Sequence, residues 1–234
     1  NIISLLDCQV MKIDKAQASA EAPARPKRGR PRDPERLKRV ILTASCQFLE
    51  QGFERTSMES VAQAAGVSKM TLYNYFASKN ALIEACVAAR TDSIFEDFGA
   101  DSLSPSRPEE ALRLIARQFL KLMRSDDVIQ LHRMLHGLAT LQPDVCQGFF
   151  KAGPTRIAQH VCRYLESAMA AGTLHIDDVP LAADQLLALM LGRPHLHATL
   201  GLGKPEAGQD EHLVREGVAL FLARYGRQPA SSES

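Results

Sequence analysis

Residues 57–76, which read SMESVAQAAGVSKMTLYNYF, predict two short helices joined by a tight turn. Gly66 can adopt the left-handed backbone conformation that such a turn requires. Ser68 can then act as the N-cap of a helix from Lys69 to Tyr75. The positions expected to face inward are apolar or small, so that two helices can cross closely: Val61, Ala62, Ala65, Val67, Leu72 and Phe76. This pattern is typical of a helix-turn-helix.

The sequence on both sides continues the helical pattern. Asp33 predicts the N-cap of a first helix that ends at Gly52, and Thr56 with Glu59 predicts a capping box at the start of the next helix. Ser78 predicts the cap of a further helix, and the apolar face of that helix comprises Leu82, Ile83, Cys86 and Val87. We therefore expect one helical domain built around the turn.

Charge is unevenly distributed along the chain. The 234 residues carry a net charge of +1, but residues 21–90 hold 12 basic and 7 acidic side chains, whereas residues 91–234 hold 14 basic and 18 acidic ones. A basic front half suggests contact with a polyanion. The outer face of the short helix carries hydroxyl, ammonium and amide groups, which suit phosphate oxygens and base edges: Ser68, Lys69, Thr71, Tyr73, Asn74 and Tyr75.

This segment resembles the DNA-binding helix-turn-helix of the TetR/AcrR family of transcriptional regulators. The resemblance rests on AAGVSK at residues 64–69, followed at fixed spacing by Thr-Leu-Tyr at 71–73, Tyr-Phe at 75–76 and Ser-Lys at 78–79. It implies an all-α protein whose residues 33–90 form a three-helix DNA-binding domain.

The resemblance further implies that the helix from Ser68 to Tyr75 enters the major groove as the recognition helix. Met70 stands where a small residue is usual, and its thioether can contact a thymine methyl but reads no hydrogen-bond pattern. For Tyr73 the alternative is packing against the preceding helix. The expected DNA contacts of the helix-turn-helix are Thr56, Ser57, Ser68, Lys69, Met70, Thr71, Tyr73, Asn74, Tyr75 and Lys79.

A basic arm precedes this domain. The stretch 14–33 is rich in Ala, Pro, Lys and Arg, so residues 1–32 are expected to be disordered. Within the arm, Arg28-Gly29-Arg30-Pro31 resembles the core of an AT-hook, whose arginines fit the narrow minor groove of A·T-rich DNA. Arg28 and Arg30 are therefore candidate DNA contacts, with a solvated run of charge as the alternative.

The second half, residues 91–228, predicts a further helical domain followed by a disordered tail at 229–234. No stretch shows sustained period-two alternation, so the expected fold is all-α. Helices are expected from Pro108, over 126–141, over 144–171 with an interruption near Gly153-Pro154, over 180–200 and over 205–225. A weaker resemblance connects this half to the ligand-binding part of AefR-like regulators through FKAGPTR at 150–156 and LESAMAAG at 165–172.

That resemblance implies ligand binding and dimerisation by the second domain. An apolar pocket for a lipophilic small molecule is expected among Phe119, Leu122, Met123, Met134, Phe149, Phe150, Ile157, Leu165 and Met169. The last two helices are expected to pair across a two-fold axis through Leu186, Leu189, Met190, Leu213, Gly217, Leu220 and Phe221. For each of these residues the alternative is a place in the core of a single chain.

The sequence lacks the motifs that mark other classes of protein. The chain has no G-x-S-x-G, H-E-x-x-H or G-x-G-x-x-G motif, so we expect neither an enzyme nor a cofactor. No apolar run approaches the roughly 20 residues of a membrane-spanning helix, so no membrane partner is expected. Five widely spaced cysteines without a C-x-x-C pair indicate the reduced thiols of a cytoplasmic protein. The family resemblance further implies a bacterial protein associated with the nucleoid.

Histidines leave a metal-binding alternative open. His132 and His136 share one helical face, and His195 and His197 follow further along the chain. The sequence does not show that they converge, as metal ligands must. We expect no metal site, and a metal-responsive sensor remains an alternative.

The sequence therefore predicts a homodimeric, ligand-responsive transcriptional regulator, and the family resemblance favours a repressor. Such a protein binds a palindromic operator in double-stranded DNA and is released by a small lipophilic effector. A non-specific architectural DNA-binding protein is the second alternative.

Overall fold

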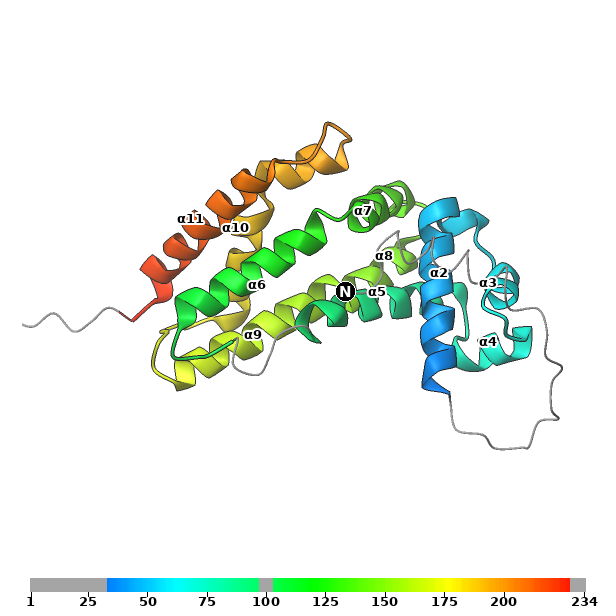
Figure 1. Cartoon of the computed structure of the whole chain (residues 1–234), viewed down its shortest axis with the longest axis horizontal. Helices are drawn as coiled ribbons and strands as arrows, with labels where there is room; N and C mark the ends of the chain where they lie inside the picture. The colour runs from blue at the N-terminus through cyan, green and yellow to red at the C-terminus, as the bar shows by residue number, and fades with distance from the viewer. Residues whose placement is uncertain (1–32, 97–102, 228–234) are drawn as a thin grey trace, which may run out of the picture. The chain divides into compact units, whose positions relative to one another are not determined.

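The computed structural model describes residues 33–96 and 103–227 (Figure 1). The arm with Arg28 and Arg30 and the tail after residue 227 lie outside the described residues. Within the described ranges the elements are α-helices: α2 (Pro34–Arg55), α3 (Met58–Ala64), α4 (Lys69–Tyr75), α5 (Lys79–Glu96), α6 (Pro108–Met123), α7 (Asp126–Leu138), α8 (Pro143–Ala152), α9 (Pro154–Ala170), α10 (Val179–Thr199) and α11 (Ala207–Tyr225). The predicted all-α class is confirmed.

Extended pairing is confined, in the described part of the chain, to one antiparallel bridge between Leu174 and Gly226. No helix in that part combines the length and the apolar character needed to cross a membrane. Cys86, Cys146 and Cys162 carry free thiols, as the sequence predicts at these positions.

The chain divides into two compact units. The described residues 33–90 and 134–152 make up the first, and 91–133 with 153–227 make up the second. The predicted boundary between the domains 33–90 and 91–228 stays a prediction. The compact units divide the chain differently, because residues 134–152 group with the first unit.

The first unit begins with a capped helix. The Asp33 carboxylate accepts hydrogen bonds from the backbone N–H groups of Glu35 and Arg36, which are among the first donors of α2. Gly52, at a φ of +79°, then breaks the helical path of α2, as its position in the sequence predicts. Apolar side chains of α2 to α5 fill the core of this unit: Val40, Ala44, Phe48, Phe53, Val61, Leu72, Phe76, Leu82 and Ile83.

The second unit is a helical bundle in which α6 packs against α10 and α11, and α10 packs against α9 and α11. Each of these helices has a continuous apolar stripe at helical spacing, and burial of the stripes in a shared core stabilises the helices. The largest fully buried side chains of this core are Leu112, Leu165, Leu186, Met190, Val161, Val214 and Val218.

Several predicted helix bounds differ from the structure. Helix α2 continues past its break at Gly52 to Arg55, and α11 begins at Ala207, two residues after its predicted start. Helix α7 ends at Leu138, three residues before the predicted end. Helix α10 is broken inside the predicted range 180–200, because Gly192 has a φ of +47° and a ψ of −163° and Pro194 follows it. The interruption predicted near Gly153-Pro154 is confirmed as the junction of α8 and α9.

Candidate nucleic-acid interface

The turn between α3 and α4 closes with two backbone hydrogen bonds. The N–H of Val67 donates to the carbonyl of Ala62 at 3.0 Å, and the N–H of Gly66 donates to the carbonyl of Gln63 at 3.2 Å. This pairing is a Schellman motif, which needs a left-handed residue, and Gly66 supplies it with a φ of +65°. The turn therefore sets the direction in which α4 leaves α3.

Helix α4 begins and ends where the sequence predicts. The Ser68 hydroxyl accepts a hydrogen bond from the N–H of Thr71 at 3.1 Å, and the Ser68 and Thr71 hydroxyl oxygens are 2.8 Å apart. Leu72 is completely buried and anchors the inner face of the helix. The outer face presents Lys69, Met70, Tyr73 and Asn74 to solvent, while Thr71 and Tyr75 are half-buried.

The exposed fractions of two side chains bear on the DNA contacts predicted for them. Met70 is 71% exposed and Tyr73 is 40% exposed. Packing within the chain therefore does not explain why a methionine stands at position 70. The Tyr73 ring lies 5.8 Å from the Lys69 ammonium, so both side chains belong to the same outward surface.

An ion pair that the sequence analysis missed joins α3 to α4. The Lys69 Nζ atom lies 2.5 Å from the Glu59 Oε1 atom, and both side chains are exposed. The hydrogen bond from Lys69 lowers the pKa of Glu59, and the bond to Glu59 raises the pKa of Lys69. Lys69 is therefore held by a carboxylate on the surface where a DNA phosphate would approach.

Thr56 is not the helix cap that the sequence predicts. Ser57 caps α3 and forms a capping box with Ser60, in which the Ser60 N–H donates to the Ser57 hydroxyl at 3.0 Å. Thr56 is 1% exposed, and its hydroxyl donates to the carbonyls of Gly52 at 2.9 Å and Gln47 at 3.1 Å. The predicted capping box at Thr56 and Glu59 is wrong because the helix begins one residue later.

Lys79 also serves the fold. Its ammonium donates to the carbonyls of Phe53 at 2.8 Å and Thr56 at 3.1 Å, and it lies 4.1 Å from the centre of the Phe53 ring. These contacts satisfy carbonyl groups at the end of α2. The charge is thus already engaged within the chain.

Two further residues position the helix-turn-helix and carry no signal in the motif itself. Arg39 on α2 donates from Nε to the carbonyl of Ala65 at 3.0 Å. Gln47 on α2 donates to the carbonyl of Ser60 at 3.2 Å and accepts from the Ser60 hydroxyl at 2.8 Å. Both contacts span more than ten residues of sequence, so local patterns could not reveal them.

Most of the predicted ligand residues lie in or against the core of the second unit. Phe119, Leu122, Met123, Ile157 and Leu165 are buried in its hydrophobic core, and Met169 packs against it. Met134, Phe149 and Phe150 belong to the other compact unit. Phe150 is 62% exposed, so it does not share the burial of the other predicted ligand residues, and its role in ligand binding stays a prediction.

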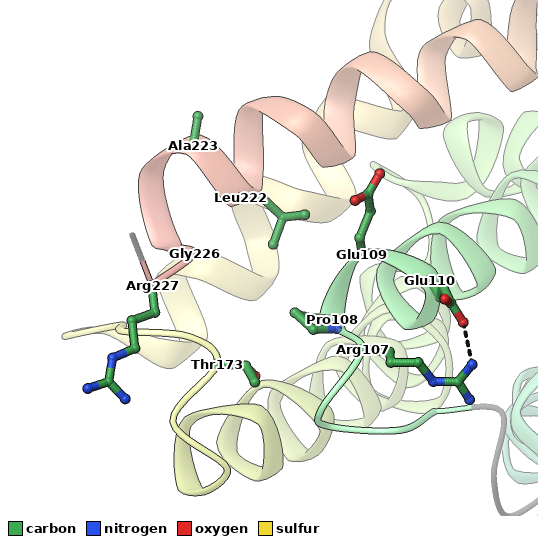
Figure 2. A pocket seen from close by; sticks show the side chains of 9 residues that line it. All are labelled: Arg107, Pro108, Glu109, Glu110, Thr173, Leu222, Ala223, Gly226 and Arg227. Atoms are coloured by element: carbon green, nitrogen blue, oxygen red, sulfur yellow. Dashed lines mark hydrogen bonds and ion pairs between the residues drawn. The ribbon is translucent and has the colours of Figure 1, made fainter. Parts of the chain in front are cut away.

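Two hollows of the second unit lie elsewhere. One, of about 500 Å³, lies between the start of α6 and the end of α11 (Figure 2). The other, of about 550 Å³, lies at the corner between α10 and α11. Neither is lined by a predicted ligand residue.

The predicted dimer residues separate into two groups. Leu186, Met190 and Phe221 are at most 2% exposed, and a Cβ atom on Gly217 would meet the side chain of Met190. These four positions belong to the contact between α10 and α11 within one chain, so their prediction as dimer surface is wrong. Leu220 is 62% exposed, and Leu189 and Leu213 are half-buried.

The histidines do not form a cluster of the kind that holds a metal. His132 Nδ1 lies 3.2 Å from His195 Nε2, a hydrogen-bond distance, and the two rings meet edge to face. His136 and His197 are exposed, and His197 Nδ1 is 3.2 Å from the carbonyl of Gly203. Within residues 33–96 and 103–227 no three His, Cys, Asp or Glu side chains converge.

Two protein families match this chain, each over a different range of residues. The family described as "Bacterial regulatory proteins, tetR family" matches residues 41–86. The family described as "AefR-like transcriptional repressor, C-terminal domain" matches residues 110–227, about half of the chain.

Solved and curated proteins agree with these matches. The flavonoid-responsive regulator FrrA is 34% identical, with a TM-score of 0.67 over 84% of this chain and 100% of its own. The activator FasR of Mycolicibacterium smegmatis is 29% identical over 41% of this chain and 43% of its own length. The repressor KstR of Rhodococcus jostii is 30% identical over 41% of this chain and 44% of its own length. The chain thus aligns with less than half the length of these curated relatives.

Proposed function

The chain belongs to the TetR family of transcriptional regulators, and from that premise we propose that it is a repressor that binds a palindromic operator as a homodimer. Its family consists of DNA-binding regulators, not enzymes. Binding of a small lipophilic effector is proposed to release the operator. The observation that carries the proposal is the outward polar face of α4 in a helix-turn-helix.

The proposed DNA contacts follow from exposure. Lys69, Met70, Thr71 and Asn74 lie at or near the free face of α4, where a recognition helix reaches base edges. Ser57, Ser68, Tyr73 and Tyr75 are proposed to contact phosphates. Thr56 and Lys79 are left out, because their polar groups are engaged within the fold.

The proposed dimer surface is the outer face of α10 and α11. Leu220 is exposed beside Ala219 and Ala223 on α11, and Leu181 and Ala188 are exposed on α10. A face of small and apolar side chains favours close pairing of helices from two chains. A two-fold dimer places two recognition helices about 34 to 36 Å apart, one turn of B-DNA.

The sign of regulation rests on the family description. The matched C-terminal family is described as a transcriptional repressor, while the curated relatives include both a repressor and an activator. Release by an effector requires that the effector bind the DNA-incompetent state more tightly than the DNA-competent one. A metal-responsive sensor is not proposed, because no set of converging ligands is found in the part of the chain that the structure describes.

Selection of bound sequences from a random duplex library tests the proposal. We expect a palindromic winner that is bound at least about a thousandfold more tightly than scrambled DNA at the same salt concentration. Equal affinity for all duplexes, falling steeply with salt, would instead identify a non-specific architectural protein. A reporter gene behind the selected operator then gives the sign, since a repressor lowers its expression.

A further inference from the structure

The hollow at the α10–α11 corner combines an apolar surface with positive charge. Its apolar lining includes Leu196, Leu200 and Leu202, which are 58%, 65% and 64% exposed, together with Pro194 and Pro205. Clustered exposed leucines are unusual on a protein surface and mark a place where something binds. The volume of about 550 Å³ lies within the range of roughly 300–1,000 Å³ typical of small-molecule sites.

Basic groups border this apolar surface. Arg193, His197 and Lys204 line the hollow, and neither Asp nor Glu is among its lining residues. Arg193 is exposed to solvent. Lys204 Nζ lies 2.7 Å from an Asp126 carboxylate oxygen, in a pair that is open to solvent. A ligand that satisfies the site therefore needs an apolar body and an anionic end.

We propose that this corner binds an amphipathic carboxylate and is the effector site of the regulator. The binding stands on the geometry alone, whereas its effect on DNA rests on the proposed function. The apolar chain lies along the leucines, and the carboxylate pairs with Arg193 and Lys204.

The hollow between α6 and α11 is a poor site for an anion. Figure 2 shows that two basic residues there, Arg107 and Arg227, share the lining with Glu109 and Glu110. Arg107 Nη1 lies 2.8 Å from Glu110 Oε2, so this pair cancels its own charge. Two carboxylates repel a third, and an anionic ligand is therefore disfavoured.

A second copy of the chain is the competing occupant of the corner, because Leu196 and Leu200 lie at the end of α10, whose outer face is the proposed dimer surface. The basic side chains Arg193 and Lys204 favour an anion, since a carboxylate pairs with their charges while its apolar chain covers the leucines. Sedimentation distinguishes the two occupants.

The corner is tied to α7 by polar contacts. Arg133 donates to the carbonyls of Ala198 at 2.7 Å and Thr199 at 2.8 Å, at the end of α10. Lys204 pairs with Asp126 in the first turn of α7. A carboxylate that takes Lys204 competes with Asp126 for the same charge. Ligand binding therefore alters one of the contacts that hold the corner to α7.

Calorimetric titration of the full chain with decanoate, without DNA, tests the site. We expect saturable binding of one decanoate per chain and at least about tenfold weaker binding in the double variant Arg193→Gln/Lys204→Gln, which loses both charge-assisted contacts. The variant Arg215→Gln removes an exposed arginine of α11 outside the hollow and is expected to bind normally. Arg227→Gln, in the other hollow, is a second matched control.

Other results would overturn the proposal. They are the absence of saturable binding below about 1 mM, equal binding by Arg193→Gln/Lys204→Gln, or a loss of binding only in Arg227→Gln. Equal affinity for decyltrimethylammonium would show that the basic groups play no part. Leu200→Asp is expected to abolish binding without changing the molar mass in sedimentation, and a lower molar mass would assign the corner to a second copy.

Operator release is measured separately. Decanoate is expected to lower the affinity for the selected operator in the wild type and not in Arg193→Gln/Lys204→Gln. Binding without release would overturn the role as effector site. Absence of any preferred operator would overturn the proposed function and leave the binding result as it stands.

Discussion

The Glu59 carboxylate lies 2.5 Å from the Lys69 ammonium, on the face where α4 would meet DNA. Replacing Glu59 by Gln frees the Lys69 ammonium from its ion pair and removes a negative charge that repels the DNA backbone. We expect tighter binding to all duplexes and a salt dependence that is steeper by about one counterion. Fluorescence anisotropy at several salt concentrations measures both. Weaker binding confined to the operator would mean instead that Glu59 itself accepts from a base, such as cytosine N4.

The same pair has a pH signature. The hydrogen bond from Lys69 lowers the pKa of Glu59 below its ordinary value of 4.5. The folded state therefore favours the carboxylate, and the stabilisation is present above the ordinary pKa and lost as pH falls through the lowered one. A carboxyl NMR titration is expected to give a low pKa for Glu59 that returns to the ordinary value in Lys69→Met. No change in that variant would show that the pair does not persist in solution.

Two residues of α4 are proposed to differ in role. Thr71, next to the start of the helix, is proposed to read a base, so Thr71→Ala is expected to narrow the difference in affinity between operator and random DNA. Tyr75 is proposed to contact phosphate, so Tyr75→Phe is expected to weaken binding to every duplex alike, by about 1 kcal/mol. Competition titrations with the two DNAs separate these effects. The reverse pattern would exchange the two roles.

At the scale of the element, the turn between α2 and α3 depends on Thr56. Its buried hydroxyl donates to two backbone carbonyls, so Thr56→Val keeps the shape of the side chain and leaves both carbonyls without that donor. We expect a loss of about 1–3 kcal/mol in the free energy of unfolding. Urea denaturation measures it, with Thr56→Ser as the control that keeps the hydroxyl. Loss of operator affinity in a folded Thr56→Val protein would restore Thr56 as a DNA contact.

Helix starts could be predicted where one local contact decides them. Ser68 and Asp33 cap their helices as expected, since each bonds an N–H group two or three residues away. Thr56 and Ser57 are both good caps, and only the tertiary contacts of the Thr56 hydroxyl decide that the helix starts after Ser57. The break at Gly192 was missed because Gly in an apolar run is compatible with a continuous helix.

The candidate DNA-binding site could likewise be predicted only where local sequence decides the structure. The exposed face of α4 follows from helical spacing once Leu72 is assigned to the core. The engagement of Lys79 by the end of α2 does not, because its partner carbonyls are 23 and 26 residues away.

At the scale of the whole molecule, helical periodicity shows which residues share a face but not what covers that face. Leu186 and Leu220 both lie on apolar stripes of the last two helices, yet Leu186 is 1% exposed and Leu220 is 62% exposed. The same limit applies to Phe119 and Met123, since an apolar stripe looks alike whether it lines a cavity or fills a core. Only the packing of α6, α9, α10 and α11 against one another distinguishes these cases.

The exposed stripe of α11 gives the test at this scale. Leu220→Glu places a charge on the proposed dimer surface, and two-fold symmetry places it there twice. We expect the molar mass in sedimentation to fall from that of two chains to that of one. Operator affinity is expected to fall at least about tenfold, since a lone chain engages one half-site. Leu141→Glu is the matched control, because Leu141 is 77% exposed and lies outside α10 and α11. If Leu220→Glu stays dimeric while Leu141→Glu dissociates, the chains pair through another surface, and the spacing of the two recognition helices has to be derived anew.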